Sequence, residues 1–148
     1  MNLAIGSATL AVAIVVAALP AQAAEIGQIK VSKGAVSVER SGQSLAGSVG
    51  LRLETADIVK TGADGTAGIT MGDNSLVSLG PNSILALERF DYEPTTSQGR
   101  FDAQLQRGTL AVVSGRIAKQ SPQAMTVRTP SAALAVRGTE FVVAAQGD

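Results

Sequence analysis

The sequence contains no cysteine and no histidine among its 148 residues. Without them the chain cannot build a Ser-His-Asp triad, a cysteine nucleophile or a zinc site with the usual nitrogen and sulfur ligands. Disulfide bonds and lipidation of an N-terminal cysteine are excluded as well. A nucleophilic Ser-x-x-Lys pair is also absent. We therefore name no catalytic residue, and we expect no enzyme activity, no cofactor and no metal.

The chain also has no net charge, since its 12 Lys and Arg residues balance its 12 Asp and Glu residues. Nucleic-acid binding depends largely on a positive surface that neutralises phosphates. A balanced chain has no net field to supply such a surface, so we expect no nucleic-acid partner.

Charge is missing altogether from residues 1–23, and residues 3–19 are almost wholly apolar. The apolar run ends at Pro20, and Ala21-Gln22-Ala23 fits the small-x-small pattern that precedes a signal peptidase cut. We predict a helical signal peptide that is cleaved after Ala23. The first alternative is a retained membrane anchor, because no Lys or Arg precedes the run and about 17 apolar residues almost span a bilayer. The second alternative is a buried helix. Membrane contact would then involve residues 3–19.

Aromatic residues are scarce, so the core of residues 24–148 must consist mainly of Val, Ile, Leu and Ala. This length is sufficient for a single domain with its own core. Large rings usually thicken the core of a globular enzyme, and their scarcity favours stacked short strands. The four aromatic residues are Phe90, Tyr92, Phe101 and Phe141.

From Ile26 onward, apolar residues recur at every second position in short runs separated by Gly, Asp, Asn, Pro or Ser. This pattern predicts an all-β domain with less than about a tenth helix. Three consecutive runs, 67–71, 76–79 and 84–87, are joined by similar four-residue connectors and repeat at intervals of eight. Such a short repeat favours a β-solenoid-like roll of short strands, although a meander would give similar intervals.

Residues 90–100 interrupt this alternation with charges, Pro94 and a Thr, Ser and Gln tract. We predict a polar loop there, and we therefore expect Gly99→Val to cost little stability. Alternation returns at Phe101 and continues to Val143.

Six short motifs, in the same order, resemble the FecR domain over nearly all of residues 24–148. The resemblance implies a periplasmic domain that resembles a β-solenoid roll and that, in founding members, helps to relay a signal from an outer-membrane transducer to a cytoplasmic sigma factor. The motifs are Gly34-Ala35-Val36, Asp57-Ile58-Val59-Lys60-Thr61-Gly62, Gly72-Asp73-Asn74-Ser75, Leu105-Gln106-Arg107-Gly108-Thr109-Leu110, Val127-Arg128-Thr129-Pro130 and Val136-Arg137-Gly138-Thr139-Glu140-Phe141.

The relay proteins carry a helical anti-sigma domain before their membrane span, whereas here only Met1 and Asn2 precede the apolar run. The resemblance therefore implies a stand-alone FecR domain, periplasmic or secreted, that binds a protein or an envelope component. The alternatives are a structural scaffold of the envelope, or a fragment of a longer FecR-type sigma-factor regulator. A carbohydrate- or metal-dependent enzyme ranks last.

Asp57, Asp64 and Asp73 are spaced 7 and 9 residues apart, so successive turns of a roll could bring their carboxylates together. Paired carboxylates can hold calcium or act as general acid and base. Asp64 and Asp73 lie in Gly, Asn and Ser turns, where a short carboxylate accepts a hydrogen bond from the backbone two residues on. We favour this structural role over calcium binding and catalysis, and we interpret the nearby glycines as turn residues, not as a phosphate loop.

The last two motifs supply the candidate interaction residues. Arg137 could pair with a carboxylate such as Asp57, or it could contact a partner, and we favour the structural role. Gly138 lies between two apolar strands and predicts a bulge, so Gly138→Val should cost about 1–3 kcal/mol. The strand at residues 141–143 could offer an unpaired edge to a partner. The candidate residues are Thr129, Pro130, Arg137, Gly138, Thr139 and Phe141.

Overall fold

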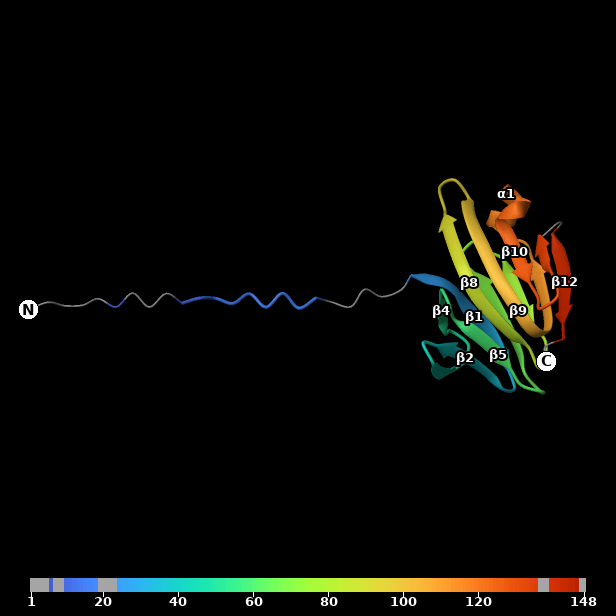
Figure 1. Cartoon of the computed structure of the whole chain (residues 1–148), viewed down its shortest axis with the longest axis horizontal. Coiled ribbons are helices and arrows are strands. Elements are labelled where there is room, and N and C mark those ends of the chain that lie inside the picture. The colour runs from blue at the N-terminus through green and yellow to red at the C-terminus, as the bar shows by residue number, and fades with distance from the viewer. Residues whose placement is uncertain (1–5, 7–9, 19–23, 136–138, 147–148) are drawn as a thin grey trace, which may run out of the picture.

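A computed structural model describes residues 6, 10–18, 24–135 and 139–146. The described residues from Glu25 onward form twelve strands, one short α-helix and one 3-10 turn (Figure 1), which confirms the predicted all-β class. The elements are β1 (Glu25–Lys33), β2 (Val36–Arg40), β3 (Gln43–Ala46), β4 (Arg52–Glu54), β5 (Ile58–Thr61), β6 (Thr66–Met71), β7 (Leu76–Leu79), β8 (Ile84–Glu93), β9 (Gln98–Val113), α1 (Arg116–Gln120), η1 (Pro122–Ala124), β10 (Met125–Arg128), β11 (Ala133–Ala135) and β12 (Glu140–Ala145).

The long strand β9 belongs to two sheets. Its first part pairs with β8 and β10, and its last part, residues 108–113, pairs with β7 and β12. We call the order β12-β9-β7-β6-β1-β4 sheet A and the order β3-β2-β5-β8-β9-β10-β11 sheet B. Because β9 is shared, the two sheets form one strongly curled surface that encloses the core.

Gly108 stands where β9 passes from sheet B to sheet A. Its φ of +97° is a conformation that side chains disfavour, and a Cβ added there would lie 2.1 Å from the Ser83 hydroxyl oxygen. Ser83 is fully buried and accepts a hydrogen bond from the Thr109 backbone N–H at 3.0 Å. The corner of β9 thus depends on a glycine packed against a buried serine.

The core lies between the two sheets and is made of alternate residues of each strand. Ile69 and Val77 from sheet A and Leu85 and Leu105 from sheet B are each at most 2% exposed. Phe101 is 1% exposed, and its ring meets that of Phe90 edge to face with centroids 5.3 Å apart. The small aliphatic core expected from the scarcity of aromatic residues is therefore confirmed.

The β-solenoid-like roll is not confirmed. The first two repeated runs form β6 and β7, which pair with each other as an antiparallel hairpin. The third run begins β8, which instead pairs with β5 and β9 in sheet B. Among the described strands, β9 and β10 form the parallel pair, and the other pairings are antiparallel. The interval of eight residues therefore reflects an antiparallel hairpin followed by the first residues of a longer strand in the other sheet.

The prediction of a loop over residues 90–100 is wrong. Strand β8 extends to Glu93 and β9 starts at Gln98, so the segment is the end of a long hairpin with a turn at residues 94–97. The alternation Phe90-Asp91-Tyr92-Glu93 has period two, and its charged residues lie on the exposed side. At the turn, the hydrogen bonds from Thr95 to the exposed Glu93 carboxylate lower the pKa of that group.

The expectation that Gly99→Val costs little stability rested on the loop prediction, and the structure contradicts its premise. A Cβ at this position would lie 2.1 Å from the Asp91 carbonyl oxygen and 3.1 Å from the Ile117 side chain. Because the strands approach so closely here, Gly99→Val should be costly and is not a neutral control.

The predicted helical leader is not confirmed by the described part of the leader. Residues 10–18 carry no helix and extend away from the sheets (Figure 1). Their large apolar side chains lie in solvent, with Leu10 and Val15 each 85% exposed. Within the residues that the structure describes, no helix is both long and apolar enough to cross a membrane. The predicted cleavage site at Ala23 lies outside the described residues.

Candidate functional site

Asp57 is a buried structural carboxylate in the turn between β4 and β5. Both its oxygens accept hydrogen bonds from Arg40, at 2.9 and 2.7 Å, and the Glu54 backbone N–H donates a third at 2.9 Å. The hydrogen bond to Asp57 raises the pKa of the Arg40 guanidinium, as does its Coulomb attraction. Both carboxylate oxygens of Asp57 therefore accept hydrogen bonds from the Arg40 guanidinium, and this bidentate ion pair ties β2 to the turn.

Asp73 is also fully buried, in the turn between β6 and β7. It accepts hydrogen bonds from the backbone N–H and the hydroxyl of Ser75, at 3.0 and 2.9 Å. A further bond at 3.1 Å comes from the backbone N–H of Ile117, in the first turn of α1. Asp73 therefore holds α1 against sheet A, and its role as a turn residue is confirmed.

Asp64 lies on the surface and accepts a hydrogen bond from the Ala35 backbone N–H at 3.3 Å. In the part of the chain that the structure describes, no hydrogen bond or ion pair joins Asp64 to Asp57 or Asp73. Among the described residues, no group of three His, Cys, Asp or Glu side chains could hold a metal ion. The three carboxylates are separate turn residues in this fold.

Three described candidate residues of the last two motifs have structural contacts. Thr129 closes the turn between β10 and β11, since its backbone N–H donates to the Ala132 carbonyl at 2.7 Å. Thr139 accepts the Ser114 backbone N–H at 2.7 Å, and Phe141 packs against the core. Pro130 is exposed in the turn. Arg137 and Gly138 lie outside the described residues, so their predicted roles stay predictions.

The outer face of sheet A carries a row of small residues between two valines. The register places Val31 beside Gly68, Gly68 beside Ser78, Ser78 beside Ala111, and Ala111 beside Val142. This row crosses five strands, and its middle three side chains are too small to fill the space above the sheet. Val31 and Val142 remain 45% and 75% exposed at its two ends.

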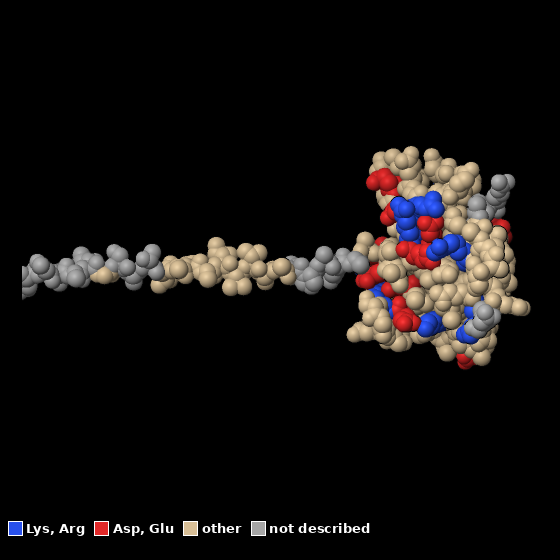
Figure 2. Space-filling model, viewed as in Figure 1, with Lys and Arg blue, Asp and Glu red and all other residues tan. Residues whose placement is uncertain are grey.

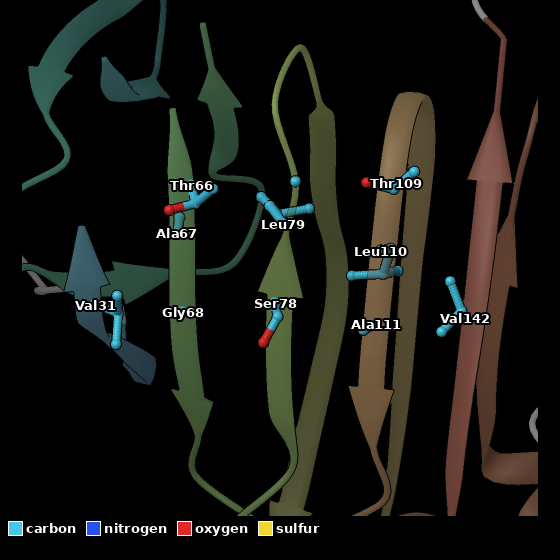
Figure 3. Close-up of a pocket in the computed structure, with 11 residues that line it drawn as sticks. Val31, Thr66, Ala67, Gly68, Ser78, Leu79, Thr109, Leu110, Ala111 and Val142 are labelled. Carbon is cyan, nitrogen blue, oxygen red and sulfur yellow. The ribbon is translucent and has the colours of Figure 1, made fainter. Parts of the chain in front are cut away.

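These residues line an open groove of about 410 Å³. Figure 3 shows Val31 and Val142 at its two sides, with Ser78 and Ala111 on the strands between them. The strands that form the floor, β6, β7 and residues 108–113 of β9, contain no charged residue. Leu76 and Val113, 46% and 36% exposed, form a neighbouring pair on the same face. The result is an uncharged, largely apolar surface on the outer face of sheet A.

The outer face of sheet B is covered by ion pairs. In Figure 2, Lys and Arg atoms lie beside Asp and Glu atoms over the hairpin of β8 and β9 and over β2 and β5. Four cations of this face each lie within ion-pair distance of a carboxylate, so the face is polar. The pairs are Lys60 with Glu39 at 2.7 Å, Arg89 with Asp91 at 2.7 Å, Arg100 with Asp102 at 2.8 Å, and Arg128 with Glu88.

Sequence reasoning missed both the groove and the partner of Asp57. The groove had a visible signal, because three neighbouring strands lack charge at the alternate positions where an exposed face usually carries it. Arg40 had no comparable signal, since it lies 17 residues before Asp57 in an ordinary alternating strand. Only the pairing of β2 with β5 brings the two together.

One comparison with known proteins gives a match. The model of the family described as FecR protein matches residues 57–148, which include β5 to β12 and every strand of the groove except β1. No curated protein and no solved structure matches the chain.

Proposed function

The chain belongs to the FecR family, and from this premise we propose that it is a non-enzymatic module of envelope signalling that acts by binding another protein. The family is associated with sigma-factor regulation and envelope signalling, and its domain is typically periplasmic. A periplasmic or secreted location of this chain, reached through cleavage after Ala23, is part of the proposal. Five large apolar side chains of the leader, exposed by 73–85%, support removal of the leader or its insertion in a membrane.

The uncharged groove on sheet A is the observation that carries this proposal. A monomer gains nothing from keeping Val142 and Leu76 in water, whereas a partner that covers them gains the apolar area that becomes buried. The floor of Gly68, Ser78 and Ala111 leaves room for side chains from outside. The occupant that fits is a protein segment with uncharged apolar side chains, because no ion is available in the floor to pair with a charged one.

A catalytic role has less support. The two buried carboxylates, Asp57 and Asp73, already accept several hydrogen bonds each, and neither faces the groove. A general acid or base must lie within hydrogen-bond reach of a substrate, and the groove lining offers hydroxyls and backbone only.

Site-specific photocrosslinking in the producing cells tests the proposal. A photoreactive residue at the exposed Val31 lies at the rim of the groove, and one at the partly exposed Lys60 lies on sheet B. We expect a protein adduct from position 31 and little from position 60. The substitution Ala111→Lys, which places a charge in the floor of the groove, should abolish the adduct.

Equal adducts from both positions, or an adduct that survives Ala111→Lys, would contradict binding in the groove. Binding of the protein to purified cell-wall polymer, unchanged by Ala111→Lys, would instead favour the scaffold role. The mass of the adduct separates a different protein from a second copy of the chain.

A further inference from the structure

The four strands at open edges differ in how they are protected. Strands β3, β4 and β11 are three or four residues long, and β4 carries two charges, Arg52 and Glu54. Short length and charge are the usual means by which proteins prevent pairing of sheet edges. Strand β12 has six residues and a single charge, Glu140, and among the described strands it pairs with β9 alone.

The backbone groups that β12 turns outward follow from its pairing with β9. The Ser114 backbone N–H donates to the Thr139 carbonyl, which makes this a hydrogen-bonded pair of the antiparallel ladder. Hydrogen-bonded pairs recur at every second residue, so residues 141, 143 and 145 direct their N–H and C=O groups at β9. Glu140, Val142 and Ala144 therefore direct theirs at the open edge.

We propose that two copies of this chain associate through β12, paired antiparallel about a two-fold axis at Val142. The proposal goes beyond the proposed function, because it concerns backbone pairing at the edge of sheet A, where the Val142 side chain also forms one side of the groove. In this register Val142 faces Val142 of the second copy, and Glu140 faces its Ala144. The outward N–H and C=O groups of residues 140, 142 and 144 of each copy then bond to the other copy, which gives about six hydrogen bonds across the axis.

A second copy is the occupant that suits the charge of this strand. An antiparallel pair of identical strands is two-fold symmetric, and the register centred on Val142 separates the two Glu140 side chains by about 14 Å along the strands. This exceeds the screening length of about 8 Å at physiological salt. The chain has no net charge that would oppose association. On the inner side, Phe141 lies opposite Val143 of the second copy, which is a favourable aromatic and β-branched pair.

Disulfide crosslinking tests the register, because the natural sequence has no cysteine. The protein is used as it is recovered from the producing cells. Facing residues of a hydrogen-bonded pair have Cα atoms about 5.5 Å apart, within the range that a disulfide spans. We expect Val142→Cys to form a covalent dimer on mild oxidation. Ala144→Cys, on the same strand and the same face, should not, since the two copies of residue 144 lie about 14 Å apart.

A mixture provides the matched control. Glu140→Cys alone and Ala144→Cys alone should each stay uncrosslinked, whereas an equimolar mixture should form a disulfide between positions 140 and 144. No covalent dimer of Val142→Cys, or faster crosslinking of Ala144→Cys than of Val142→Cys, would overturn the proposal.

Sedimentation equilibrium of the protein without cysteine substitutions checks that the association is native. Val142→Lys places two ammonium groups side by side across the axis and should weaken the dimer by at least about tenfold. The residue is 75% exposed in the monomer, so folding should be unaffected, which circular dichroism verifies. A monomer at all concentrations, or an unchanged dimer of Val142→Lys, would refute the edge pairing.

Ala111→Lys separates this inference from the proposed function. It lies in the floor of the groove, so it should abolish the partner adduct and leave the crosslink at position 142 intact. Loss of the adduct with retention of the dimer supports both proposals. A dimer without any adduct from position 31 overturns only the proposed function.

Discussion

Sheet A and sheet B share a core and one long strand, yet their outer faces have opposite chemistry. Sheet B exposes paired charges such as Lys60 with Glu39, whereas the central strands of sheet A expose Gly68, Ser78 and Ala111. Charged side chains keep a face soluble at little cost, because surface pairs contribute about 0–1 kcal/mol. A face without them is stable in water only while it stays small, or when something covers it. This difference is the basis for proposing sheet A as the contact side of the domain.

The strongest way to break this arrangement is to disturb the corner of β9 that joins the two sheets. We expect Gly108→Ala to destabilise the protein by about 3–4 kcal/mol, from the positive φ and from the collision of its Cβ with Ser83. Gly42→Ala is the matched control, because Gly42 has a φ of +78° and no atom within 4 Å of an added Cβ. It should cost about 1 kcal/mol. Urea melts that gave equal midpoints would remove the corner as a special feature.

The next largest effect on stability concerns the ion pair between Arg40 and the buried Asp57 in sheet B. Arg40→Met leaves the Asp57 carboxylate, 1% exposed, without its cation, and should cost about 3 kcal/mol. Arg89→Met breaks the exposed pair with Asp91 and should cost less than about 1 kcal/mol. Equilibrium unfolding of both variants measures the difference. Similar losses would mean that Asp57 is not held by Arg40.

Smaller effects should distinguish the two faces by their response to salt. A double-mutant cycle on Leu76 and Val113, neighbours on sheet A, should give a coupling of about 0.5 kcal/mol that salt leaves unchanged. The same cycle on Lys60 and Glu39 should give about 0.5 kcal/mol at low salt and almost nothing at 1 M salt. A salt-sensitive coupling on sheet A would contradict its assignment as the uncharged face.

The smallest expected effect on stability is that of removing the leader, residues 1–23, which belongs to neither sheet. If it is a signal peptide, the intact mass of the recovered protein corresponds to a chain that starts at Ala24. Strand β1 starts at Glu25, so the loss of residues 1–23 should change the unfolding free energy by less than about 0.5 kcal/mol. Recovery of the full-length mass from the inner-membrane fraction would show an anchor instead.

Local patterns in the sequence were sufficient for the class of the fold and for the turns. Alternation in Val36-Ser37-Val38-Glu39 predicts a strand whose Val38 is buried, as observed. Asp73 with Ser75 predicts a turn in which the carboxylate accepts a backbone N–H two residues on, and that bond is present. Both predictions succeed because period-two burial and Asx turns depend on a few adjacent residues.

The segment at residues 90–100 shows where local reasoning fails. Charge and Pro94 suggested a loop, but Arg100 with Asp102 and Arg89 with Asp91 form pairs that make a charged strand stable on an exposed face. The deciding contact is Phe90 against Phe101, eleven positions apart, and nothing in either neighbourhood specifies it.

The sequence by itself determined the all-β class, an aliphatic core, turn carboxylates and the family to which the chain belongs. The tertiary structure alone decided that β9 serves two sheets, that Arg40 partners Asp57, and that uncharged positions of five strands meet in one row. The physical reason is that alternation fixes which side chains of a strand are buried together, but not which strand lies beside it. Strand order is set by long-range packing, and the groove exists only in that order.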